Sequence, residues 1–343
     1  MEENSSTTFI PRPKAWLLGK KAQMIMLSRV FLLTALLFAN ISNADALAKE
    51  QFAKGFTLYN QHDWINSQEP LRTAAKAGIS EAQYYLAEAL RLSNRYMTEE
   101  SQKWYEAAAE QDDLFAMIRL LDNDDLCGIL QENCKKDRMY WKKRAQSLAQ
   151  EQATSGNNVA MHAMYYLSGN RDWLVKAANA GNYEAEYFLV DLMLSDTRDK
   201  KTGRSTLQPE AEKYLKASAE GGNPKAMSLY ATILNENGEY KESRKWLEKC
   251  LLTSHNNCVL LLEHIHKQLY TDFNNLGYKP DKSIAYGLLL FRRDALGKAK
   301  TSSMFDTFED ELTAEQKAEG EKFFHEWKKT HPPLSFHVPK LGF

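Results

Sequence analysis

Four cysteines, and a group of histidines close to the second cysteine pair, are the residues of this chain best suited to redox or metal chemistry. The cysteines form two local pairs: Cys127 with Cys134, and Cys250 with Cys258. An even number of cysteines in an exported protein predicts disulfide bonds, because oxidising compartments let such bonds persist. The alternative is a metal site that joins the second pair to His255, His264 and His266. Export, which the start of the chain predicts, favours the disulfides, so we predict no metal ion.

Motifs for nucleophilic, metal-dependent or nucleotide chemistry are missing from the sequence. There is no G-x-S-x-G elbow, H-E-x-x-H helix, P-loop or dinucleotide fingerprint. The pair His325-Glu326 lacks the second histidine that a metalloprotease helix requires. His264 and His266 are two positions apart, so they would point to different sides of a helix. We therefore predict a protein that is not an enzyme and binds no cofactor.

A short phrase of small and aromatic residues recurs along the chain. One copy contains Leu71, Ala74, Ala75, Gly78 and Ala82. The next, 34 residues on, contains Trp104, Tyr105, Ala108, Ala109, Asp112 and Ala116. Further copies begin near Tyr140, Trp173, Tyr214 and Trp246. A repeat of this length indicates helix-turn-helix units stacked into a solenoid, because one such unit cannot bury its own apolar face.

The repeated pattern W-Y-x-K-A-A-x-x-G-x-x-x-A resembles the Sel1-like repeat, a relative of the tetratricopeptide repeat. The resemblance covers roughly residues 48–293 and implies an all-α, right-handed solenoid of paired helices. Cysteine-rich secreted members of this family clamp adjacent helices with disulfides at the spacing of Cys250 and Cys258. The resemblance therefore implies a disulfide between these two residues. Strand signals are nearly absent, since no segment sustains alternation of apolar and polar residues.

The solenoid is expected to span residues 47–298 and to be followed by a different C-terminal segment. Helix pairs are predicted at 48–78, 81–111, 113–155, 158–180, 182–221, 224–253 and 257–297. Residues 122–136 and 195–208 lengthen their repeats and are expected to form surface loops; the alternative is that they form part of a binding face. In residues 299–343 a helix capped by Thr313 precedes a proline-containing tail. We expect this segment to cap the last repeat, and a tail that binds a partner is the alternative.

The start of the chain predicts export. Arg29 precedes a short apolar run, residues 30–38, and small residues follow at 42–46. Such a sequence is typical of a secretory signal peptide, and the run is too short to span a membrane. Cleavage is expected near Ala44 or Ala46, so residues 1–46 would be absent from a periplasmic or secreted protein that does not stay inserted in the membrane. Because signals begin close to the initiator, translation is expected to start at Met24 or Met26 rather than at Met1.

Charge and repeat position suggest what the protein binds. The chain has 44 basic and 45 acidic residues, a net charge of −1, which is no electrostatic footprint for nucleic acid. In tetratricopeptide-like arrays the first helix of each pair lines the inner face. Tyr85, Arg119 and Phe188 share a position in those helices, and aromatic and arginine side chains are common interface anchors. We predict that these three contact a protein partner; the alternative is that they pack in the core.

An exported Sel1-like protein of this size resembles the periplasmic immunity proteins that neutralise lipase or phospholipase effectors of type VI secretion. The resemblance implies a toxin-binding solenoid without an active site. The alternative is an exported scaffold or regulator that binds a cell-envelope component or a host protein.

Overall fold

A computed structural model describes residues 44–121, 137–196, 207–269, 271–297, 301 and 307–341. The chain divides into two units, Met1–Glu50 and Gln51–Phe343. Of the first unit, residues 44–50 are described, and they are helical. The sequence that predicts the signal peptide therefore lies almost wholly outside the described residues, as do Cys127 and Cys134. The second unit contains the repeated helices.

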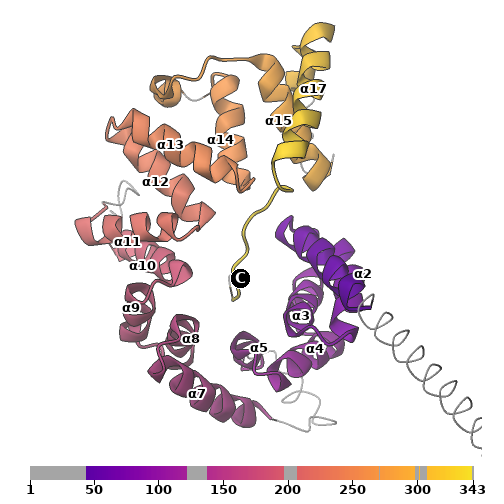
Figure 1. The fold of residues 1–343 in the computed structure, drawn as a ribbon, viewed down its shortest axis with the longest axis vertical. Helices are drawn as coiled ribbons and strands as arrows, with labels where there is room; N and C mark the ends of the chain where they lie inside the picture. The colour runs from indigo at the N-terminus through magenta and orange to yellow at the C-terminus, as the bar shows by residue number, and fades with distance from the viewer. Residues whose placement is uncertain are drawn as a thin grey trace, which may run out of the picture. The chain divides into compact units, whose positions relative to one another are not determined.

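The second unit is built from consecutive helices, each packed against the next (Figure 1). Residues 51–60 are helical, and they are followed by α2 (Trp64–Lys76), α3 (Ser80–Asn94), α4 (Glu99–Glu110), α5 (Leu114–Arg119), α7 (Arg138–Thr154), α8 (Asn158–Ser168), α9 (Arg171–Asn179), α10 (Tyr183–Asp196), α11 (Pro209–Glu220), α12 (Pro224–Glu236), α13 (Tyr240–Leu251), α14 (Asn256–His266), the 3-10 helix η1 (Thr271–Leu276), α15 (Lys282–Leu296) and α17 (Ala314–Thr330). The described residues contain one isolated bridge, between His255 and Ser335, and no strand. The predicted fold class, an all-α solenoid of helix pairs, is confirmed.

The turn that precedes α8, α10 or α12 has a common chemistry. Its first residue takes a left-handed backbone conformation, as at Gly156, Gly181 and Gly222, with φ of 94°, 79° and 104°. Glycine adopts this conformation without steric cost, which explains why the sequence phrase contains it. The next residue is Asn157, Asn182 or Asn223, and its side chain accepts hydrogen bonds from the backbone N–H groups of the helix that follows. At these three turns the glycine thus ends one helix and the asparagine that follows it caps the next.

The turn before α5 is built from different residues. Asp112 takes the left-handed conformation with φ of 64°, and Asp113 is the N-cap. Oδ1 of Asp113 accepts from the N–H groups of Phe115 and Ala116, both at 3.0 Å. Aspartate caps a helix as well as asparagine does. This turn therefore places a carboxylate where three other repeats place a neutral amide.

Three hydrophobic clusters lie in the interior of the described part of the unit, and the C-terminal tail contributes to the two larger ones. The first cluster runs from Tyr59 to Ala163 and the second from Leu174 to Phe291. Val338 belongs to the first cluster and Leu334 to the second, at 6% and 1% exposure. The tail is therefore packed into the array at two places far apart in the sequence.

Helix α17 packs closely on α15 before the tail begins. Gly287 and Gly320 face each other across this contact: a Cβ at Gly287 would lie 2.7 Å from the Gly320 carbonyl oxygen. Thr313 caps α17 in a capping box with Gln316. From α17 the tail turns back and runs inside the array, with α2–α5 on one side and α8–α11 on the other (Figure 1).

Candidate functional site

The tail, residues 332–341, is a non-helical, largely extended segment held along the inner side of the helices, with left-handed residues at His337 and Leu341. Near its start the N–H of Ser335 donates to the carbonyl of Ser254 at 3.0 Å. The carbonyl of Ser335 accepts from the N–H of Asn256 at 2.8 Å. Asn256 opens α14, so the tail satisfies one of the N–H groups that a helix leaves free at its first turn.

Asn60 binds the backbone of the tail at two points. Its main-chain carbonyl accepts from the N–H of Phe336 at 2.8 Å, and its side-chain Oδ1 accepts from the N–H of Val338 at 2.9 Å. Between the two donors, His337 takes a left-handed backbone conformation with φ of 47°, so the tail bends there and both N–H groups reach Asn60. Farther along, the N–H of Leu341 donates to the hydroxyl of Tyr84 at 3.1 Å. These three bonds contact only backbone atoms of the tail, so they do not depend on its side chains.

Lys340 is the tail residue with the most specific side-chain environment. Its Nζ donates to Oδ2 of Asp113 at 2.7 Å. The same atom lies 4.7 Å from the ring centre of Tyr84 and 5.5 Å from that of Phe115. A carboxylate and two aromatic faces around one ammonium group combine an ion pair with cation–π attraction. We call Tyr84, Asp113 and Phe115 the cation site.

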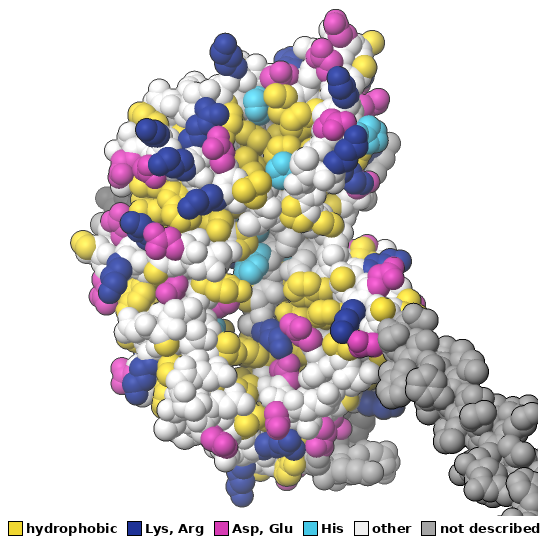
Figure 2. Space-filling model, viewed as in Figure 1, with side chains coloured by type: hydrophobic (Ala, Val, Ile, Leu, Met, Phe, Trp, Pro, Cys, Tyr) yellow, Lys and Arg dark blue, Asp and Glu magenta, His cyan; other side chains and the backbone are white. Residues whose placement is uncertain are grey.

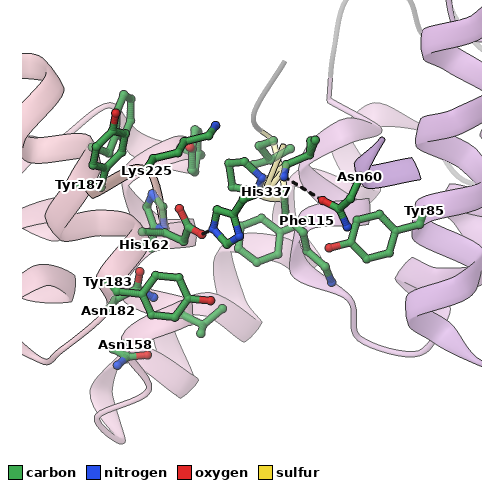
Figure 3. Close-up of a pocket in the computed structure, with 18 of the residues that line it drawn as sticks. Asn60, Tyr85, Phe115, Asn158, His162, Asn182, Tyr183, Tyr187, Lys225 and His337 are labelled. Carbon is green, nitrogen blue, oxygen red and sulfur yellow. Dashed lines mark hydrogen bonds and ion pairs between the residues drawn. The ribbon is translucent and has the colours of Figure 1, made fainter. Parts of the chain in front are cut away.

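Two further side chains hold the tail. The ring of Phe336 stacks on that of His62, with centroids 4.2 Å apart. The side chain of His337 points away from Asn60 (Figure 3), and its Nε2 lies 2.6 Å from Oε1 of Glu184. The tail thus contacts both sides of the space through which it runs.

A cavity of about 920 Å³ remains beside the tail, and we call this space, together with the tail's own track, the groove. One wall is formed by residues 51–60, α3 and α5, with Asn60, Tyr85 and Phe115 facing the tail (Figure 3). The other wall is formed mainly by α8 and α10. It carries Asn158, Val159, His162, Tyr166, Asn182, Tyr183, Glu184, Tyr187, Phe188 and Asp191. Aromatic rings, amides and carboxylates dominate this wall, a composition suited to adaptable protein contacts.

Burial sets the charge state of one residue on this second wall. Burial lowers the pKa of His162 to about 4, and the nearby Glu184 opposes that shift. His162 is therefore a neutral imidazole near pH 7. Over the face shown in Figure 2, charged side chains of both signs are interspersed with hydrophobic ones. Neither the groove nor this face has the single-sign charge expected of a nucleic-acid surface.

The structure separates the three predicted partner-contact residues. Tyr85 and Phe188 line the groove from opposite walls. Tyr85 packs against Phe56, and Phe188 stacks on Tyr166 with ring centroids 6.3 Å apart. Their contact with a partner stays a prediction.

Arg119 lies beneath the groove wall rather than on it. It is 6% exposed and ion-paired with Glu88, which also pairs with Arg91 at 2.8 Å. Burial alone would raise the pKa of Glu88, but the two arginines outweigh it and the pKa is lowered. Arg119 can therefore support the wall, and a partner contact through its side chain would require this buried pair to open.

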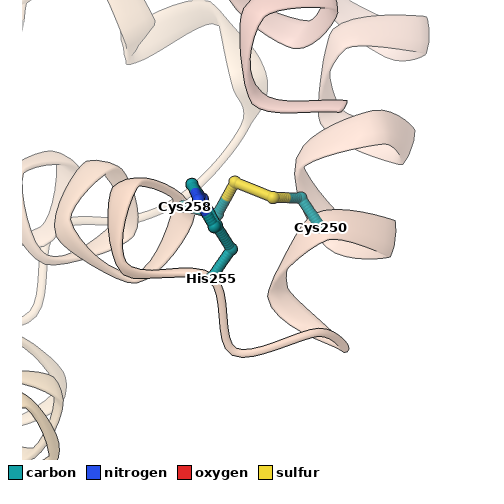
Figure 4. Close-up of side chains that lie close together, drawn as sticks. All are labelled: Cys250, His255 and Cys258. Carbon is teal, nitrogen blue, oxygen red and sulfur yellow. A yellow bond between two sulfur atoms is a disulfide. The ribbon is translucent and has the colours of Figure 1, made fainter. Parts of the chain in front are cut away.

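The second cysteine pair forms the disulfide that the sequence predicts. Cys250 at the end of α13 bonds to Cys258 in α14, with Cα atoms 6.1 Å apart (Figure 4). The bridge clamps adjacent helices across their turn. His255 lies in that turn close to both sulfurs, but a metal bound by these sulfurs would require the bond to be reduced.

The residues that hold the tail were not predicted. Asn60, Tyr84 and Lys340 stand outside the repeated phrase, and the contacts that join Asn60 and Tyr84 to the tail span more than 250 residues of sequence. One signal was available in the repeat itself. Asp113 is a carboxylate at the N-cap position where other repeats carry asparagine, a difference visible once the turns are aligned.

Comparisons with known proteins give limited further information. No family model matches the sequence, and a search of curated proteins finds no match. Among solved structures the chain is similar to c5321, a protective antigen present in uropathogenic Escherichia coli strains and displaying an SLR fold. The identity is 17% over 83% of this chain and 62% of that chain, with a TM-score of 0.44.

A second solved structure is a Sel1 repeat protein from Oxalobacter formigenes. It shows 23% identity over 59% of this chain and 84% of that chain, with a TM-score of 0.30. Our chain spans about three fifths of the length of c5321. Similarity at this level carries no information on function, so the functional proposal below rests on the groove.

Proposed function

We propose that this protein is a non-enzymatic solenoid that binds an extended segment of a partner protein in its groove. The observation that carries the proposal is the tail itself. The groove already holds an extended polypeptide through three backbone N–H groups, at Phe336, Val338 and Leu341. Acceptors that contact only backbone atoms accommodate any extended segment that presents donors at the same spacing.

The cavity beside the tail supports binding of something larger than the tail alone. Its walls are helices of a packed array, so the surface exists before a partner arrives and little ordering cost attaches to binding. Tyr187 and Phe188 face this cavity from α10 and offer the aromatic contacts that often dominate interface energies. A partner segment would replace the tail on its track and place additional side chains in the cavity.

We further propose that the partner is a lipase or phospholipase effector of type VI secretion, and that the protein is its periplasmic immunity protein. An inhibitor of a periplasmic toxin needs export, a binding surface and no active site. The Cys250–Cys258 disulfide is compatible with an oxidising compartment. Among the described residues, no helix has both the length and the apolar character required to cross a membrane. Export by the predicted signal peptide, residues 1–46, belongs to the same proposal.

The proposal predicts a lipase-like effector encoded by an adjacent gene, and the test is co-expression of that effector with this protein. The effector is directed to the periplasm of a sensitive strain with and without this chain, and survival is counted. We expect survival only when the chain is present, together with a single complex of the purified pair in gel filtration. Equal killing in both cultures, with the two proteins eluting separately, would show that the immunity proposal is wrong.

A matched pair of variants tests whether the groove is the surface used. Val159 lines the groove and is 44% exposed, so Val159→Arg adds a bulky cation there without disturbing the core. Leu252, 64% exposed at the end of α13, is not a lining residue and provides the control Leu252→Arg. We expect Val159→Arg to lose the complex and Leu252→Arg to keep it.

A further inference from the structure

The cation site contains more charge than the local fold requires. Asp113 uses Oδ1 to cap α5 and Oδ2 to bind Lys340. Asn157, Asn182 and Asn223 cap the equivalent helices with an amide oxygen alone. The negative charge of Asp113 is therefore not needed for capping, and its counterpart in the structure is the ammonium group of the tail.

The surroundings of Asp113 favour a cation over other side chains. Its side chain is 8% exposed and that of Lys340 is 22% exposed, so the pair is shielded from most of the solvent. Two aromatic rings, of Tyr84 and Phe115, face the same ammonium group. An anionic side chain placed here would meet both the carboxylate and the negative faces of the rings. A neutral side chain would leave a largely buried carboxylate without its partner.

The cation site and the backbone contacts together define which side chains a bound segment needs at two positions. Asn60 binds the N–H of Val338, whose side chain is buried in the first hydrophobic cluster. The cation site binds the side chain two positions later, at Lys340. A segment that follows the backbone path of the tail therefore presents an apolar residue to the core and, two positions later, a basic residue to the cation site.

We propose that the cation site recognises a lysine or arginine of the partner's extended segment, two positions after an apolar residue, and that Lys340 occupies the site until the partner displaces it. This inference rests on the proposed function, because it specifies the chemistry of the segment that the groove binds. The tail acts as an internal competitor. A segment tethered to its own site experiences an effective concentration in the millimolar range, so displacement requires a partner with better or additional contacts.

The experiment uses the full chain with its own tail weakened. Val338→Asp places a charge at a position of the tail that is 6% exposed, so the tail should leave the groove while the helices keep their sequence. The probe is a fluorescent synthetic peptide with the sequence of residues 334–343, added in trans and followed by anisotropy. A second peptide has norleucine in place of the lysine at position 340, which keeps the length of the side chain and removes its charge.

We expect the lysine peptide to bind the Val338→Asp protein about tenfold more tightly than the norleucine peptide, a preference that falls at high salt. Adding Asp113→Asn should abolish the preference and keep the cap of α5. The matched control is Asp112→Asn, because Asp112 is the adjacent carboxylate and pairs with Arg144 rather than with the tail. The control should retain the tenfold preference.

The outcomes separate the inference from the proposed function. Equal affinities for the two peptides would contradict recognition of a basic side chain by the cation site, but would be consistent with binding of a segment in the groove. A preference that survives Asp113→Asn would also contradict that recognition. If neither peptide binds, while hydrogen exchange shows that the tail amides of the Val338→Asp protein have lost protection, the groove does not bind extended segments and both proposals fail.

Discussion

The two walls of the groove differ in what they do in the unbound protein. The wall made by residues 51–60, α3 and α5 holds the tail with backbone hydrogen bonds and the cation site. The wall made by α8 and α10 contacts the tail through the pair of Glu184 with His337 and otherwise faces the cavity with aromatic and polar side chains. The first wall therefore fixes the register of a bound segment, and the second can select what lies beside it.

The difference extends beneath the surface. Under the first wall lies a buried glutamate, Glu88, paired with Arg119 and Arg91 and accepting a hydrogen bond from Tyr105 at 2.7 Å. On the second wall the carboxylate of Glu184 remains 23% exposed. The carboxylate under the first wall is thus shielded from solvent, whereas the carboxylate on the second wall is partly solvated. Substitutions on the two walls should therefore differ in their cost.

The largest expected effect is from Glu88→Gln. The substitution leaves two arginines beneath the first wall without their counter-charge, and breaking a buried pair in this way costs about 3 to 5 kcal/mol. Glu184→Gln on the second wall should cost less than about 1 kcal/mol, because its pair is partly solvated. Urea denaturation followed by circular dichroism measures both. Equal losses for the two variants would remove the contrast between the walls.

The next effect concerns the tail as a structural element. Leu334 is 1% exposed in the second hydrophobic cluster, so Leu334→Ala should lower the free energy of unfolding by about 2 to 4 kcal/mol. Leu252→Ala, at a site that is 64% exposed, should change it by less than about 0.5 kcal/mol. If the unfolding midpoints of the two variants coincide, the tail is not packed into the array as described.

A pH-dependent effect, smaller for each pH unit than the substitutions above, comes from buried histidines. Burial lowers the pKa of His162 on the second wall, and of His255 before α14, to about 4 from the ordinary value of 6.5. Between these values the unfolded chain binds a proton that the folded chain does not, so the free energy of unfolding falls as the pH falls from 6.5 to 4. Each histidine contributes about 1 kcal/mol per pH unit in that window and nothing above it.

Denaturation at about pH 7.5, 6 and 5 measures this slope. His162→Gln should reduce the slope by the share of one histidine, because glutamine does not titrate. A slope unaffected by His162→Gln would mean that the imidazole is accessible to protons in the folded protein.

The solenoid could be predicted because most repeats contain the small residues that pack between helices and the turn residue that ends a helix. The alanines at positions such as Ala108 and Ala109 are fully buried, and the left-handed turn residues fall where the phrase places glycine. Such signals are local and periodic, so they can be recognised in the sequence without knowledge of contacts between distant residues. The approximate helix positions and the all-α class follow from them.

The groove's occupant could not be predicted in the same way. The tail has no repeat and no helical period, and Asn60 and Tyr84, which bind its backbone, lie at the other end of the second unit's sequence. Arg119 shows the same limit: its position in the repeat indicates the inner face, but its pairing with Glu88, 31 residues earlier, becomes evident only when α3 and α5 are placed side by side. Repeat position identifies the helix that lines the groove, but not which side chain is exposed there.

The smallest expected effect is a change in amide exchange of the tail, which compares how strongly the ion pair on each wall binds it. Asp113→Asn removes the ion pair with Lys340 but keeps the cap of α5, so global stability should change by less than about 1 kcal/mol. Because the pair with Lys340 is the more buried of the two that hold the tail, its loss should release the end of the tail locally. We expect amide exchange at Leu341 to rise about two- to fivefold in Asp113→Asn, and to rise less in Glu184→Gln, as measured by hydrogen–deuterium exchange at low salt. The reverse order would place the stronger hold on the second wall, and the first wall would then no longer be the one that sets the register.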